Sequence, residues 1–264
     1  MARQRADVTL VERGVFPSRE RARAAIMAGE VRLDGQPLGK AGEMVDPDAS
    51  FEVAEVPQYV SRGGHKLASA LDKFSVDVTG ARALDVGAST GGFTDCLLKR
   101  GAAHVTAVDV GYGQLAWSLR QDERVRVLER TNIRSIGTDA LGAPFDVIVV
   151  DVSFISLSKV LPHIVPLLAD GGDLVALVKP QFEVGKGRVG KKGVVRDRAA
   201  HEDVLRSAVH AAYEHGLVVR GLTWSPLKGP EGNIEFWLWA ARGGNAVAAD
   251  PADVVAGAHA ELGE

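Results

Sequence analysis

The sequence predicts an α/β protein in which a doubly wound, mostly parallel sheet follows a small α+β domain. From Arg82 onward, apolar runs of strand length alternate with segments of helix length, as is typical of such sheets. A glycine-rich turn closes the first of these runs at residues 87–92, where open parallel sheets hold adenosine-containing cofactors. The first 56 residues have shorter elements, and residues 1–40 hold a local excess of Lys and Arg, so residues 1–56 predict a separate domain.

The composition is that of an ordinary globular chain and excludes several classes of protein. Of 264 residues, 46% are hydrophobic and 25% are charged, and the net charge of −3 means that nucleic-acid binding must come from local patches. The single cysteine, Cys96, excludes a disulfide framework and a cysteine-rich metal cage, and no residue is assigned to a metal. The sequence shows no signal peptide and no apolar run of the ~20 residues that span a membrane, so we expect a cytoplasmic protein.

Short elements fill the N-terminal domain, for which we expect residues 1–56. Ser18 is a good N-cap for a helix, and Gly14 and Gly29 are good helix ends. Residues 1–40 hold eight Lys or Arg against five Asp or Glu, which indicates a basic face. The expected elements are the helices Val8–Gly14 and Arg19–Ala28 and the strands Val31–Leu33 and Phe51–Val53.

A linker at residues 57–62 is expected next, because Pro57 limits the continuation of a helix or a strand. The larger domain then spans residues 63–240, and residues 241–264 form a tail or a terminal helix. Its expected strands are Arg82–Gly87, His104–Asp109, Val125–Leu128, Phe145–Asp151, Asp173–Lys179, Leu217–Trp224 and Ile234–Trp239. Its expected helices are Lys66–Phe74, Gly92–Arg100, Gln114–Arg120, Ser156–Leu168 and Ala199–His215. The short loop between the last two strands favours an antiparallel pair, so the sheet should have five parallel strands and an antiparallel edge strand.

The glycine-rich turn does not have the spacing of a dinucleotide fingerprint. That fingerprint reads G-x-G-x-x-G, whereas Ser89 stands here at the position where a glycine admits the pyrophosphate. Asp109 ends the next strand, 24 residues after Asp85, and a carboxylate at this point can accept two ribose hydroxyls. Asp85 suits either a zwitterionic amino acid or the bracing of the turn itself.

The pattern D-x-G-x-x-x-G-G-F resembles the S-adenosylmethionine motif of FtsJ-like methyltransferases. The resemblance implies a Rossmann-like class I methyltransferase sheet, S-adenosylmethionine as cofactor, and an adenine contact from the turn after the third strand. The implied cofactor residues are Asp85, Gly87, Ala88, Ser89, Thr90, Gly91, Gly92, Phe93, Asp109 and Asn132.

Charged residues end two neighbouring strands and predict a catalytic crevice. Asp151 and Lys179 close near-continuous apolar runs, and the carboxyl ends of adjacent parallel strands face one crevice. Glu235 lies within a run of large apolar residues, where a carboxylate is costly unless it is paired, and a lysine is its natural partner. Lys66, in the sequence Gly-Gly-His-Lys, completes a set of two lysines and two carboxylates.

The contexts G-G-H-K-L, V-V-D-V-S-F, L-V-K-P-Q-F and G-N-I-E-F resemble those of the TlyA family of ribosomal RNA 2′-O-methyltransferases. The resemblance spans nearly the whole chain and implies methylation of a cytidine ribose in large-subunit, and in some members small-subunit, ribosomal RNA. Lys66, Asp151, Lys179 and Glu235 would be the catalytic residues. Lys179 would be central, either as the base or as the stabiliser of the developing alkoxide.

The order R-G, S-R-x-x-A, I-x-x-G-x-V, D-G in the first fifth of the chain resembles the S-four-type RNA-binding domain. The resemblance implies that the arginines of its helix face RNA phosphates, which position RNA without specifying its sequence. A second basic segment runs from Lys179 to Arg198, with seven Lys or Arg against two acids; it lacks the hydroxyl and the helix of a nucleotide P-loop. The candidate RNA contacts are Arg3, Arg5, Arg19, Arg21, Arg23, Arg62, Arg134, Lys186, Arg188 and Lys191.

Three other functions compete with methylation. Members of the TlyA family are often labelled haemolysins, so a membrane-active protein is one alternative, which the lack of an apolar span disfavours. A non-catalytic RNA-binding protein is a second, and the four polar catalytic positions argue against it. A dehydrogenase is disfavoured by Ser89.

Overall fold

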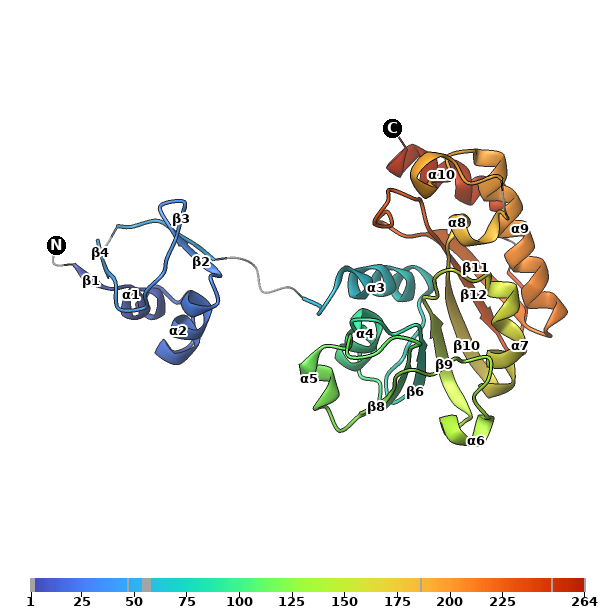
Figure 1. The fold of residues 1–264 in the computed structure, drawn as a ribbon, viewed down its shortest axis with the longest axis horizontal. Helices are drawn as coiled ribbons and strands as arrows, with labels where there is room; N and C mark the ends of the chain where they lie inside the picture. Colours follow the sequence, from blue (N-terminus) through green and yellow to red (C-terminus); the bar gives the residue numbers. More distant parts are fainter. Residues whose placement is uncertain (1–2, 47, 54–57, 186, 248, 264) are drawn as a thin grey trace. The chain divides into compact units, whose positions relative to one another are not determined.

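The computed structural model describes residues 3–46, 48–53, 58–185, 187–247 and 249–263. The chain divides into two compact units, residues 1–57 and residues 58–264, each with its own core (Figure 1).

The first unit is built from two helices and five short strands. Ser18 caps the second helix, since its Oγ accepts a hydrogen bond from the Arg21 N–H at 3.3 Å. Leu10, Ile26 and Val31 pack in its core. The elements are β1 Gln4–Arg5, α1 Ala6–Glu12, α2 Arg19–Met27, β2 Val31–Leu33, β3 Gln36–Pro37, β4 Met44–Val45 and β5 Phe51–Val53. They form one two-stranded sheet, β1-β4, and one three-stranded sheet, β3-β2-β5.

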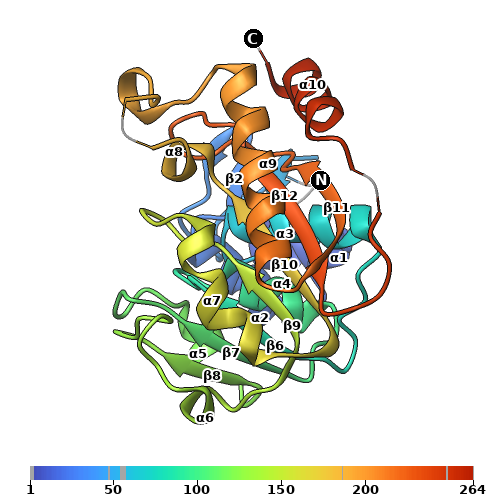
Figure 2. The ribbon, with the colours of Figure 1, turned by 90° about the vertical axis from the view of Figure 1, so that its right-hand side faces the viewer.

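The second unit is a seven-stranded sheet with helices on both faces, and it confirms the predicted α/β class. Its strands are β6 Arg82–Val86, β7 His104–Val108, β8 Val125–Leu128, β9 Phe145–Val150, β10 Leu168–Val178, β11 Val218–Trp224 and β12 Phe236–Ala241. Its helices are α3 Arg62–Phe74, α4 Gly92–Lys99, α5 Trp117–Arg120, α6 Thr138–Leu141, α7 Leu161–Ile164, α8 Pro180–Glu183, α9 Arg198–Glu214 and α10 Pro251–Leu262, with short 3₁₀ turns at Leu157–Lys159, Val165–Leu167 and Lys191–Gly193. Helices α7 and α9 cover one face, and α3 and α4 cover the other (Figure 2).

The antiparallel strand lies inside the sheet, which corrects the prediction of an antiparallel edge. The strand order is β11-β12-β10-β9-β6-β7-β8, and β12 pairs antiparallel with both β10 and β11. The edge strand β11 is therefore parallel to the other five. This position gives β12 two pairing partners, and its apolar residues Phe236 and Trp237 are completely buried.

Two helices differ from their predictions because the local backbone cannot continue them. The expected helix 156–168 is broken into three short turns, since Pro162 and Pro166 lack the N–H that a continuous helix requires. The expected helix 114–120 begins only at Trp117, because Ala116 is extended and its N–H bonds to the Thr90 carbonyl at 3.1 Å.

Residues at both ends of the second unit are buried, although the sequence predicted a linker at one end and a tail or a terminal helix at the other. Tyr59, expected in the linker, is buried in the core beside α3, and the Val60 N–H bonds to Asp95 Oδ2 at 2.8 Å. Helix α3 therefore begins at Arg62, and Lys66 lies one turn inside it rather than at its start. In the C-terminal segment, α10 packs against α9 and buries Val255 and Ala258.

Candidate active site

The glycine-rich turn joins β6 to α4 and lies directly against the end of β9. Gly87 has φ +88°, and a Cβ atom there would stand 2.5 Å from the carbonyl oxygen of Asp151. The Asp151 N–H in turn bonds to the Val86 carbonyl at 2.9 Å. A side chain at position 87 would separate the turn from β9, so glycine is required here for contact as well as conformation.

A second set of glycines brings the starts of α3 and α4 together. A Cβ atom on Gly92 would lie 2.3 Å from Ser61 Oγ and 2.8 Å from the Gly64 nitrogen. Gly64 has its own close neighbour, since a Cβ there would lie 2.2 Å from the ring of Tyr59. The Gly-Gly pairs of both helices thus allow a close crossing, and this crossing positions Lys66 beside the turn.

Asp85 is completely buried at the base of the turn. Its Oδ2 accepts a hydrogen bond of 2.7 Å from Thr94 Oγ1, whereas Oδ1 has no hydrogen-bond partner among the described residues. Burial raises the pKa of the Asp85 carboxyl to about 7, against the lowering effect of the Thr94 hydrogen bond. The contact with Thr94 is consistent with the second of the two roles considered for Asp85, which is to brace the turn.

Asp109 closes β7 and binds the turn through backbone amides. Its carboxylate accepts hydrogen bonds from the Ser89 N–H at 2.8 Å and the Gly111 N–H at 2.6 Å. The Thr131 N–H bonds to the Asp109 carbonyl at 2.9 Å, so the turn that carries Asn132 lies beside this strand end. Each carboxylate oxygen keeps lone pairs for further donors, so the geometry suits a ligand with two neighbouring hydroxyls.

The four predicted catalytic residues form two short ion pairs. Lys66 Nζ lies 2.5 Å from Glu235 Oε2, and the Lys179 Nζ lies 2.5 Å from Asp151 Oδ1. Lys66 and Glu235 are buried, at 8% and 1% exposure; in the second pair the Lys179 side chain is only 11% exposed, and that of Asp151 is 25% exposed. The sequence predicted that these four groups would meet, and the structure adds which lysine pairs with which carboxylate.

The register of β10 and β12 brings the two pairs to one edge of the sheet. Val178 and Phe236 form the last pair of this ladder, and Lys179 directly follows the one as Glu235 directly precedes the other. The site therefore contains the Lys179–Asp151 pair beside the glycine turn and the buried Lys66–Glu235 pair at the same end of the strands.

Two residues near Lys179 were missed by the sequence analysis. Ser153 Oγ accepts a hydrogen bond from Lys179 Nζ at 3.0 Å. Phe154 has φ +65°, which is unusual for a bulky residue, and its side chain is 90% exposed, with its ring 5.0 Å from that of Phe182. The signal available in the sequence was an aromatic residue three positions after a strand-end carboxylate, without its exposure.

The candidate RNA contacts of the first unit gather only in part. Arg5 and Arg23 line an open groove of about 820 Å³ with Lys40, and Met27 lies at it with 71% exposure. Arg21 is not among the residues that line this groove. Three of the arginines bind carboxylates: Arg3 pairs with Asp46, and both Arg5 and Arg19 bond to Asp7.

The candidate contacts of the second unit lie on exposed segments. Arg62 donates to the Lys228 carbonyl at 3.0 Å, and Arg134 follows the Asn132 turn. Arg188 pairs with Asp203 at 2.8 Å. Lys186 lies outside the described residues, as does the side chain of Lys191.

The basic segment after β10 is anchored by a residue that the sequence analysis did not single out. Asn233 is buried, its Oδ1 accepts from the Val195 N–H at 2.9 Å, and its Nδ2 donates to the Gly193 carbonyl at 3.0 Å. One side chain thus ties this segment to the residues just before β12, among which is Glu235.

Among the described residues, no three His, Cys, Asp or Glu side chains converge as metal ligands, and no described helix is long and apolar enough to cross a membrane.

Comparison with known proteins matches both units to described families. Residues 59–242 match the FtsJ-like methyltransferase family, and residues 4–50 match the S4 domain. A 16S/23S rRNA (cytidine-2′-O)-methyltransferase TlyA of Mycobacterium tuberculosis is 51% identical over 90% of this chain and 89% of its own. A Bacillus subtilis protein with the provisional name rRNA methyltransferase YqxC is 51% identical over 89% of this chain and 85% of its own. A solved Streptococcus thermophilus structure, provisionally labelled a hemolysin, is 43% identical with a TM-score of 0.75, covering 99% of this chain and 97% of its own.

Proposed function

This chain belongs to the FtsJ-like methyltransferase family, in its TlyA branch, and we propose that it transfers a methyl group from S-adenosylmethionine to the 2′-oxygen of a cytidine ribose in ribosomal RNA. The observation that carries the proposal is the pairing of Lys179 with Asp151 at the end of β9, in direct contact with the glycine-rich turn. A ribosomal substrate also fits the cytoplasmic location that the sequence suggests.

The residues around the turn fit this cofactor. Asp109 retains acceptor capacity for two ribose hydroxyls, and the Asn132 turn lies beside it for the adenine. The buried Asp85 stabilises the turn through Thr94, and the glycines allow close approach of backbone. When bound, S-adenosylmethionine supplies an electrophilic methyl group on a positively charged sulfur.

The lysine at the end of β10 acts on the nucleophile. A ribose 2′-hydroxyl must lose its proton as the new O–CH₃ bond forms, so a group must accept the proton or stabilise the developing negative charge. Lys179 is held at 2.5 Å by Asp151 and at 3.0 Å by Ser153, and these two contacts fix the position of its amino group. As a free amine it accepts the proton, and as an ammonium it stabilises the oxyanion.

The buried pair has a positioning role. Glu235 fixes Lys66 from the residue just before β12, and the Gly229 backbone packs against the other carboxylate oxygen, where a Cβ would lie 2.6 Å from Oε1. Together these contacts hold the Lys66 ammonium in position before substrate binds.

RNA is held by the basic groove of the first unit and by exposed groups of the second. Arg5, Arg23 and Lys40 offer phosphate contacts around an open groove. In the second unit, the exposed ring of Phe154, three residues beyond Asp151, offers a surface on which the base of the target nucleotide can stack.

The test uses the intact protein, tritiated S-adenosylmethionine and isolated ribosomal subunits, with mapping of the labelled nucleotide. We expect label on a cytidine ribose of large-subunit RNA, and the small subunit forms the second arm. Lys179→Ala should abolish transfer while cofactor binding stays near wild type. Lys159→Ala, at an exposed lysine outside the site, is the matched control. Absence of label from both subunits, or a Lys179→Ala variant with most of its activity, would contradict the proposal.

A further inference from the structure

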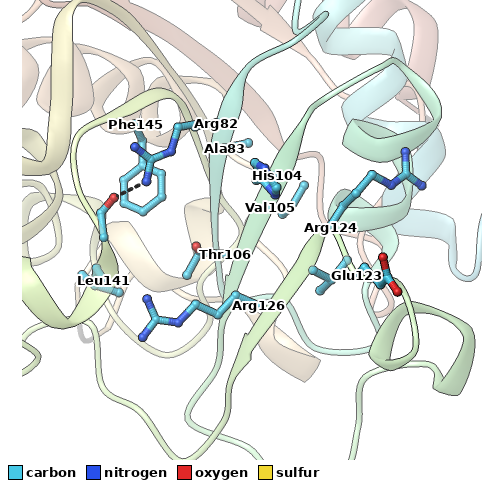
Figure 3. A pocket seen from close by; sticks show the side chains of 12 residues that line it. Arg82, Ala83, His104, Val105, Thr106, Glu123, Arg124, Arg126, Leu141 and Phe145 are labelled. Carbon is cyan, nitrogen blue, oxygen red and sulfur yellow. Dashed lines mark hydrogen bonds between the residues drawn. The ribbon is translucent and has the colours of Figure 1, made fainter.

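The second unit has a cavity at the opposite end of its strands from the proposed active site. Its volume is about 480 Å³, within the range of small-ligand sites. It opens where β6, β7 and β8 begin, whereas Asp151 and Lys179 follow the ends of their strands. We call it the distal groove. The side chains around it include Arg82, Ala83, His104, Thr106, Arg126 and Phe145 (Figure 3).

The distal groove exists because this part of the sheet face lacks a long covering helix. Parallel sheets normally have both faces covered, but the helix before β9, α6, is only four residues long. On this face the strands carry polar groups instead of a continuous apolar surface: Arg82 pairs in register with His104, and Thr106 with Arg126. The uncovered area is therefore cationic.

Two guanidinium groups converge on one point at the groove's edge. Arg82 Nη2 and Arg126 Nη1 lie 3.7 and 3.6 Å from the position that a Cβ atom would take on Gly142, so they are separated by at most the sum of these distances. Arg82 also donates to the Gly142 carbonyl at 2.6 Å. Within the part of the chain that the structure describes, the side chain of Arg126 has no hydrogen bond or ion pair. An anion between these like charges would relieve their repulsion.

The remaining lining completes a site with a charged rim and a mixed floor. Thr106, only 8% exposed, contributes a hydroxyl, and it lies between Arg82 and Arg126 in Figure 3. Ala83 and Phe145 supply buried apolar surface. Planar guanidinium forks match phosphate oxygens, a hydroxyl can donate to them, and an apolar floor can take a sugar or a base.

We propose that the distal groove binds the phosphate of a nucleotide, with the guanidinium groups of Arg82 and Arg126 on its oxygens. The phosphate has two sources: a free mononucleotide, or a nucleotide of the ribosomal RNA that reaches this edge of the sheet. The second source rests on the function proposed above, whereas the first does not.

The test compares wild type with Arg126→Gln, with Arg126→Lys to restore the charge and Arg206→Gln on α9 as the matched control. Calorimetry with cytidine 5′-monophosphate measures the free ligand, and filter binding of large ribosomal subunits over a salt series measures RNA. Trp fluorescence during thermal unfolding checks that every variant folds as wild type does.

If a free nucleotide is the ligand, Arg126→Gln should weaken cytidine monophosphate binding at least fivefold, and Arg126→Lys should recover most of it. If the RNA backbone is the source, the slope of log K against log salt should fall by about 0.9, because the variant neutralises one phosphate fewer. Equal affinities and slopes in all four proteins would overturn the proposal. These binding assays involve no methyl transfer, so their failure is distinct from an absence of label in the subunits.

Discussion

The buried pair of Lys66 and Glu235 provides the sharpest test of how the site is held. Lys66→Met leaves the Glu235 carboxylate, which is 1% exposed, without its counter-charge. Glu235→Gln leaves the buried Lys66 ammonium without its counter-charge. Removing one partner of a buried ion pair costs about 3–5 kcal/mol. The double variant buries no charge, so we expect it to be destabilised by less than either single variant.

The free energy of unfolding can be followed for the second unit alone. All four tryptophans lie in that unit, at positions 117, 224, 237 and 239, so urea unfolding monitored by their fluorescence reports its transition. Methyl transfer should fall at least about 100-fold in all three variants, because correct placement of catalytic groups contributes several kcal/mol. The reasoning would be refuted if each single variant lowered the free energy of unfolding by less than about 1 kcal/mol and these losses added in the double variant. That result would mean that solvent screens the ion pair.

Three further outcomes follow from other parts of the site. Burial raises the pKa of Asp85 to about 7, above the ordinary 3.9 of the unfolded chain. The stability that this group contributes is therefore present at low pH and is lost as the pH rises from about 4 to 7. Asp85→Asn should remove that loss, as measured by urea unfolding at pH 5 and 8. Gly92→Ala should cost about 1–3 kcal/mol and slow methyl transfer, because the added Cβ would overlap Ser61 and push α3 from α4, and an unchanged melting temperature would contradict this. Phe154→Ala should leave stability unchanged at its 90% exposure but weaken transfer to subunits by about 1–3 kcal/mol, and equal kcat/KM would exclude stacking.

The strands of the larger unit could be predicted because their signal is local. Runs such as Phe145–Val150 are apolar apart from the exposed Asp146, and burial between two layers of helices requires this composition. The position of β12 in the sheet could not be predicted. The short connection between β11 and β12 indicates that these two strands pair, but it does not indicate which strand lies on the other side of β12. Only the pairing of β12 with β10 as well as β11, set by contacts distant in sequence, places it inside the sheet.

The candidate site shows the same division between local and distant signals. The identities of Asp151 and Lys179 were readable because each ends an apolar strand, and the fold brings them to 2.5 Å. The partner of Glu235 depends on the crossing of α3 over α4, which no local pattern specifies. Phe154 escaped prediction because its significance lies in an exposure and a backbone conformation that only the folded chain shows.

The interior position of β12 has a consequence for how the protein forms during synthesis. The strand lies between β10 and β11, yet it leaves the ribosome after both of them. Until then β10 has an unpaired edge and the buried Lys66 has no carboxylate, so a nascent or truncated chain would expose a strand edge prone to misassociation. Insertion of this single late strand therefore both completes the sheet and brings Glu235 to the proposed catalytic set, so that we expect a chain ending before Glu235 to be unable to act on RNA even where most of its fold is present.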